Sequence, residues 1–147
     1  MKKWLKIQEQ DTSQIIAVKL EKRIKSIARN DADEIYPFIA TMMGLKLQGK
    51  HEARIKGIEG ASLEKLMLKS LDELFIFLAS SKPLVIVLED LHWADLTSIE
   101  FLNSHFRLAL ENPILFINVF RLAYKETSDR IMKITQERYS PVTVNIK

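Results

Sequence analysis

The chain has 147 residues, of which 47% are hydrophobic and 28% are charged, and its formal net charge is +3. This composition supplies a buried core and argues against intrinsic disorder, and the charge excess is too small to indicate nucleic-acid binding by itself. The chain has no cysteine, which excludes a disulfide framework and a thiolate metal site.

The length corresponds to about one domain. No apolar run approaches the roughly 20 residues that a membrane-spanning helix needs. The basic start, Met1 to Lys6, is not followed by the apolar stretch of a signal peptide. We therefore expect a cytoplasmic protein with no membrane partner.

The first half of the chain has the pattern of helices. Thr12 or Ser13 can cap a helix that runs to about Arg29. The acidic residues from 30 to 34 predict a second helix over 34–43, with Pro37 near its first turn, because carboxylates favour helix N-termini.

A glycine-rich connector follows these helices. Residues 44–61 contain all four glycines of the chain and predict a connector with one short helix. Ser62 then predicts the cap of a longer helix that ends at about Ala79. Residues 1–82 are thus predicted to form a helical segment.

The second half alternates strand and helix patterns. Residues 84–88 are all apolar and follow Pro83, which predicts a strand buried on both faces. A helix should follow, capped by Thr97 with Glu100 in a capping box or by the rival Asp95. The remaining predicted elements are a strand over 114–120, a helix over 126–138 and a strand over 142–146. The predicted class is α/β, with a β-α-β-α-β parallel sheet over 83–147.

Two adjacent carboxylates, Glu89 and Asp90, end the first predicted strand. Ligands of open α/β sheets bind at the carboxyl ends of the strands. Two neighbouring acids repel one another and are costly to bury unpaired, and a bound cation relieves both effects. The alternative is that they cap the next helix or pair with a base.

Residues 88–95, Leu-Glu-Asp-Leu-His-Trp-Ala-Asp, resemble the Walker B segment of STAND/AAA-type signalling ATPases. These are P-loop domains of large regulators, including those fused to class III adenylate cyclase domains. The resemblance implies a partial P-loop NTPase fold with ATP and Mg²⁺ as cofactors. It places Glu89 on the metal side, holding Mg²⁺ through water, and it makes Asp90 the catalytic residue that faces the attacking water.

The resemblance also implies a role for Arg121, which closely follows the second predicted strand. In the family this strand ends in a short Tyr-Arg or Thr-Arg element that senses the γ-phosphate, and here the chain reads Val119-Phe120-Arg121. Arg121 is therefore a candidate for nucleotide binding, and the alternative is an ordinary arginine at the rim of the sheet. We assign no chemistry to His92 or Trp93, and we expect Trp93 to pack under the loop.

A P-loop ATPase also needs a phosphate-binding loop of the form G-x-x-x-x-G-K-[ST]. Residues 44–51 match this pattern except at the last position, where His51 replaces the hydroxyl residue. The segment before it is predicted to be a helix instead of a strand, so we prefer a phosphate-binding loop upstream of Met1. The helical segment 1–82 and the sheet unit 83–147 would then form one incomplete domain, whose unpaired sheet edge could support a homo-oligomer.

The leading hypothesis is an ATP-binding and ATP-hydrolysing switch domain, or part of one, in a signalling regulator. Its partners would be the remaining domains of that regulator or a second chain, and hydrolysis by this chain alone is doubtful. The alternative is a catalytically inert interaction module that keeps the fold. Nucleic-acid binding ranks last, because the basic residues of the first helix lack aromatic interleaving and fit a solvated helix face.

Overall fold

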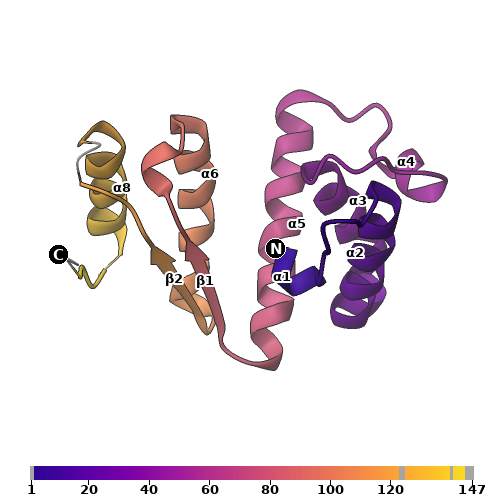
Figure 1. Ribbon diagram of the computed structural model, residues 1–147, viewed down its shortest axis with the longest axis horizontal. Helices are drawn as coiled ribbons and strands as arrows, with labels where there is room; N and C mark the ends of the chain where they lie inside the picture. The colour runs from indigo at the N-terminus through magenta and orange to yellow at the C-terminus, as the bar shows by residue number, and fades with distance from the viewer. Residues whose placement is uncertain (1, 123–124, 140, 145–147) are drawn as a thin grey trace. The chain divides into compact units, whose positions relative to one another are not determined.

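The computed structural model describes residues 2–122, 125–139 and 141–144 (Figure 1). The chain divides into two compact units, Met1–Lys82 and Pro83–Lys147, which are described separately below. The division falls where the sequence pattern changes from helices to alternating strands and helices.

The first unit is helical. Its elements are α1 (Lys2–Leu5), α2 (Ser13–Ala28), the 3-10 turn η1 (Arg29–Asp31), α3 (Ala32–Met42), α4 (Lys50–Ile55) and α5 (Gly60–Ser81). The helices α2, α3 and α5 contact one another, because each has apolar residues at helical spacing on one side. The best-buried side chains of this core are Leu20, Ile24, Ile35, Phe38, Ile39 and Leu74.

The helix ends of the first unit agree with the sequence predictions at one position and differ at two. Thr12 is confirmed as the cap of α2, since its Oγ1 accepts a hydrogen bond from the Ile15 amide at 3.3 Å. The cap prediction for Ser62 is wrong, because α5 already begins at Gly60 and Ser62 lies in its first turn. Pro37 lies buried inside α3, past its first turn, because η1 leads directly into the helix and starts it two residues earlier than predicted.

The second unit is an α/β arrangement. Its elements are β1 (Leu84–Leu88), the 3-10 turn η2 (Leu91–Trp93), α6 (Leu96–Phe106), α7 (Leu108–Glu111), β2 (Ile114–Asn118) and α8 (Lys125–Arg138). Figure 1 shows β1 and β2 side by side. They pair in parallel, with Leu84 opposite Ile114 and Leu88 opposite Asn118. A parallel pair joined through helices is a βαβ unit.

The predicted third strand is not formed in the described residues. Residues 141–144 are irregular, with Val142 91% exposed and Val144 76% exposed. Residues 145 and 146 lie outside the described part of the chain. The alternating pattern was insufficient because a strand also needs a neighbouring strand for its backbone hydrogen bonds. The described order is therefore β-α-β-α, where the sequence predicted β-α-β-α-β.

The prediction that the first strand is buried on both faces is also wrong. Val85 and Val87 are 54% and 51% exposed, whereas their neighbours in β1 are half-buried. Leu88 packs against the cluster formed by Leu91, Ile99 of α6 and Ile131 of α8. The helices of this unit thus cover the side of the sheet that carries Leu88. Within the part of the chain that the structure describes, no helix combines the length and apolar character that a bilayer crossing requires.

Candidate functional site

The carboxyl edge of the two-stranded sheet brings the predicted site residues to one side of the second unit. Backbone pairing continues beyond the strands, because the Val119 amide donates to the Leu88 carbonyl at 2.8 Å and the Leu91 amide donates to the Val119 carbonyl at 3.1 Å. The segment with Glu89 and Asp90 is therefore held beside the segment that leads to Arg121. All three of these charged residues are exposed.

Asp90 has a left-handed backbone conformation, with φ 56° and ψ 31°. This conformation is unfavourable for residues other than glycine, although aspartate tolerates it better than most. It turns the chain from β1 into η2, where the Trp93 amide donates to the Asp90 carbonyl at 3.0 Å. The Asp90 side chain makes no capping hydrogen bond and is 74% exposed. Its carboxylate is thus presented to solvent at the end of the strand.

His92 is the base beside Asp90. Its Nε2 lies 4.0 Å from Asp90 Oδ1, and its side chain is only 2% exposed. The expectation that Trp93 packs under the loop is wrong, because Trp93 is 69% exposed. The short turn η2 directs Leu91 and His92 into the unit and leaves Trp93 outside. Buried His92 therefore lies beside the Asp90 carboxylate, a contact that the sequence pattern did not indicate.

A third acid on this loop has a structural role. Asp95 caps α6, because its Oδ1 accepts a hydrogen bond from the Ser98 amide at 2.7 Å. Hydrogen bonds from the Ser98 side chain and backbone lower the pKa of Asp95. The leading prediction, that Thr97 caps this helix, is wrong because the helix begins at Leu96, and the rival prediction of Asp95 is confirmed. Because Asp95 satisfies the N-terminus of α6, this helix does not require Glu89 or Asp90 as its cap.

The segment that carries Arg121 is tied to α8. The hydroxyl of Ser128 donates a hydrogen bond to the Arg121 carbonyl at 2.8 Å, and Ser128 is completely buried. This contact fixes the backbone at Arg121, while the residue remains exposed at the edge of the sheet. Arg121 therefore has an anchored backbone on the same edge as the two acids.

Asn118 is a site candidate that the sequence analysis missed. It is the last residue of β2 and lies in register with Leu88, directly before Glu89. Its Oδ1 is buried and has no hydrogen-bond partner among the described residues. A buried polar atom without a partner is destabilising, which marks it as a place for a ligand or a water molecule. The available sequence signal was a single polar side chain at the end of an apolar strand.

The chemistry of these residues fits one magnesium ion that brings phosphate ligands with it. Mg²⁺ is usually held by one or two carboxylates together with water and substrate phosphates, and Glu89 and Asp90 supply two exposed carboxylates. Within the described residues, no group of three or more histidine, aspartate and glutamate side chains gathers around a metal-sized position.

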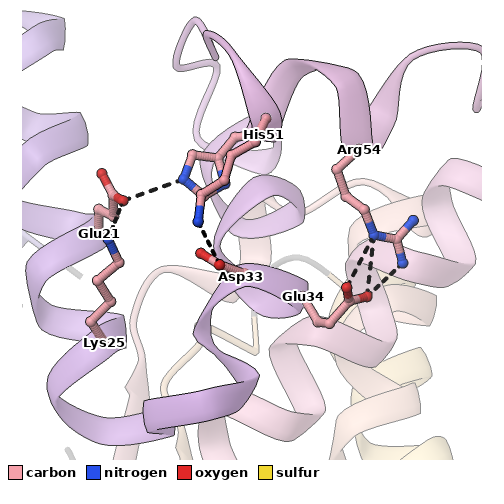
Figure 2. A network of polar contacts seen from close by, with 7 residues as sticks. Glu21, Lys25, Asp33, Glu34, His51 and Arg54 are labelled. Carbon is pink, nitrogen blue, oxygen red and sulfur yellow. Dashed lines mark hydrogen bonds and ion pairs between the residues drawn. The ribbon is translucent and has the colours of Figure 1, made fainter.

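The glycine segment from 44 to 51 has a different setting from a phosphate-binding loop. It follows the helix α3 and leads into α4, which has only six residues. Lys50 Nζ pairs with Asp33. His51 Nε2 lies 3.3 Å from Glu21 Oε1 (Figure 2). This segment belongs to the first unit, and its lysine already has a carboxylate partner.

The second unit also has a shallow cavity of about 370 Å³ beside η2 and α6. It is lined by Leu91, Ala94, Asp95, Thr97, Ser98, Phe101 and Leu102, so Glu89 and Asp90 lie outside it.

Comparison of the chain with protein-family models, with curated proteins and with solved structures gives no significant match.

Proposed function

We propose that residues 83–147 are the Walker B and sensor part of an ATPase-type switch domain, with a partial P-loop fold and with ATP and Mg²⁺ as its cofactors. One observation carries the proposal: Glu89 and a left-handed, solvent-directed Asp90 follow the first strand of a parallel βαβ unit. An unfavourable backbone conformation at the carboxyl edge of a parallel sheet supports a functional reason for that residue.

Each residue then has a definite part in phosphoryl transfer, which depends mainly on positioning and charge stabilisation. Glu89 would hold Mg²⁺ through water, and Asp90 would orient the attacking water. Arg121 would stabilise charge on the γ-phosphate from its anchored backbone. The unpartnered Oδ1 of Asn118 would accept a hydrogen bond from the same water or from a ligand water of the metal.

The second unit provides only the Walker B and sensor side of such a site, and the glycine segment near Lys50 follows a helix and precedes a six-residue helix, which is not the setting of a phosphate-binding loop. The proposal therefore requires a phosphate-binding loop from another part of a parent regulator or from a second chain. ATP affinity of this chain alone should be weak and should depend on Mg²⁺.

Calorimetric titration with a non-hydrolysable ATP analogue tests this proposal. We expect weak binding that requires Mg²⁺ and is lost in the double variant Glu89→Gln, Asp90→Asn. Glu111→Gln is the matched control, because Glu111 is an exposed acid on α7, directly before β2 at the opposite end of the sheet. Binding that is independent of Mg²⁺, or equal in the double variant and the control, would refute the assignment.

A second candidate function is an interaction module without nucleotide chemistry. It is supported by the apolar face of the sheet, where Val85, Val87, Leu115 and Ile117 are 41% to 55% exposed. Exposed apolar patches of this kind mark contact surfaces, and unpaired strand edges can add a strand from another chain. This function predicts no response to Mg²⁺ and nucleotide, together with self-association that Val87→Lys abolishes in sedimentation analysis.

A further inference from the structure

The first unit contains a cavity of about 430 Å³ between α3, α4 and α5. Its lining combines apolar side chains with charged ones. The apolar members are Phe38, Leu66, Ile76 and Phe77, and the charged members are Asp31, Glu34, Arg54, Lys69 and Glu73. Cavities with an apolar lining and a few converging polar groups are typical of small-ligand sites.

A guanidinium group of the chain itself, that of Arg54, lines this cavity. The guanidinium carbon of Arg54 is 5.5 Å from the centroid of the Phe38 ring. Its Nη2 and Nε donate hydrogen bonds to Glu34 Oε2 at 2.6 Å and 3.2 Å, as Figure 2 shows. An aromatic face and a carboxylate together are a standard way to bind a planar cation. The cavity thus has the chemistry of a guanidinium site.

Arg54 is carried by the short helix α4, which His51 attaches to the rest of the unit: the His51 side chain is 12% exposed, contacts the Tyr36 ring and lies 3.3 Å from Glu21 Oε1. The six residues of α4 include none that is buried. Gly49 precedes the helix with φ 60° and Gly57 follows it with φ 78°, a backbone region open mainly to glycine. The pair Lys50–Asp33 is exposed on both sides, at 63% and 52%, and ion pairs of this kind contribute little stability. Displacing the Arg54 side chain alone breaks its exposed ion pair with Glu34 and its contact with the Phe38 ring, and it leaves the His51 contacts of α4 in place.

We propose that the groove between α3 and α5 binds a guanidinium group on an apolar stem, and that the Arg54 side chain, as a removable plug, occupies the guanidinium position over Phe38. When Arg54 leaves, the described lining residues retain three carboxylates, Asp31, Glu34 and Glu73, and one cation, Lys69. This balance selects a cationic ligand over an anionic one. The guanidinium would take the place over Phe38 beside Glu34, and the stem would lie on the apolar lining.

The variant Arg54→Gln removes the plug and tests the proposal. We expect the full chain with this change to bind butylguanidinium at least tenfold more tightly than the unsubstituted chain in an NMR titration. The aromatic signals of Phe38 should shift with the ligand. Arg23→Gln is the matched control, because the Arg23 guanidinium also lies 5.5 Å from an aromatic ring, that of Trp4, and does not line the cavity. This control should bind no better than the unsubstituted chain.

Three further measurements make the test decisive. Adding Glu34→Gln to Arg54→Gln should remove the gain, and pentanoate, an anion with a similar stem, should not bind. The tripeptide Leu-Arg-Leu is titrated in parallel with butylguanidinium. Tighter binding of the peptide would show that the guanidinium group comes from an arginine side chain of a partner protein. The Arg54 and Glu34 side chains are 40% and 62% exposed, so their replacement leaves the core intact. No gain with unchanged helical circular dichroism, or equal binding of pentanoate, would overturn the proposal.

Discussion

Replacing Asp90 with glycine should not destabilise the protein, even though a candidate catalytic group is removed. Asp90 has φ 56°, and a left-handed conformation costs a non-glycine residue about 1–2 kcal/mol. Glycine avoids that cost but loses roughly 0.5–1 kcal/mol through its greater freedom in the unfolded chain. The expected order of stability is therefore Gly above Ala at position 90 by about 1 kcal/mol, with Asp between them because its short polar side chain tolerates this region.

Urea unfolding followed by circular dichroism measures this order. Position 89 is the matched control, because positive φ values among the described non-glycine residues occur only at Lys6, Arg29 and Asp90. At position 89 the order should reverse, with Glu89→Ala more stable than Glu89→Gly by about 0.5–1 kcal/mol. Equal stability of Asp90→Ala and Asp90→Gly would refute the backbone argument. If Asp90→Gly is more stable than the unsubstituted protein, Asp90 is not there for stability, and this result would support a functional reason for the aspartate.

Three further predictions concern the core, the sheet edge and pH. Leu74→Ala should lower the free energy of unfolding by about 2–5 kcal/mol, because Leu74 is 1% exposed and its removal leaves a cavity in the core. Urea unfolding measures this loss, and a loss below about 1 kcal/mol would contradict the assigned core. Ser128→Ala should lower the free energy of unfolding by about 1–3 kcal/mol, because it removes the hydroxyl that donates to the Arg121 carbonyl. Unchanged stability, together with an unchanged NMR signal of the Arg121 amide, would show that the contact is unimportant. Hydrogen bonds from Arg54 lower the pKa of Glu34 below its ordinary 4.5. The stabilisation that they give is present above pH 4.5 and is lost as the pH falls through the lowered pKa. Glu34→Gln should therefore flatten the dependence of unfolding free energy on pH between about pH 6 and 3, and identical profiles for the two proteins would contradict this.

Local sequence signals identified the elements whose limits depend on neighbouring residues. The apolar run after Pro83 predicted β1 with the observed bounds, Leu84–Leu88, because a breaker precedes it and two acids follow it. The acids follow β1 and Arg121 follows β2, so the parallel pairing places both segments at the carboxyl edge of the sheet. The sequence left two candidate caps for α6, Asp95 and Thr97. The hydrogen bond from the Ser98 amide to Asp95 Oδ1 in the structure identifies Asp95 as the cap.

Features that depend on distant contacts could not be read from the sequence. The valines at 142 and 144 alternate as in a strand, yet no strand forms there in the described residues, because pairing requires a neighbour that the pattern does not reveal. The register that places Asn118 opposite Leu88 is equally non-local. The same is true of the contact between Arg54 and the Phe38 ring, which joins α4 to α3.

Paramagnetic Mn²⁺, used in place of Mg²⁺ with a non-hydrolysable ATP analogue, probes the central assignment most directly. If the acids after β1 receive a metal-bound triphosphate, line broadening of backbone amides should be strongest at residues 89–91 and 118–121, and Glu89→Gln with Asp90→Asn should abolish it. Broadening spread evenly over surface carboxylates, or unchanged in the double variant, would contradict the assignment.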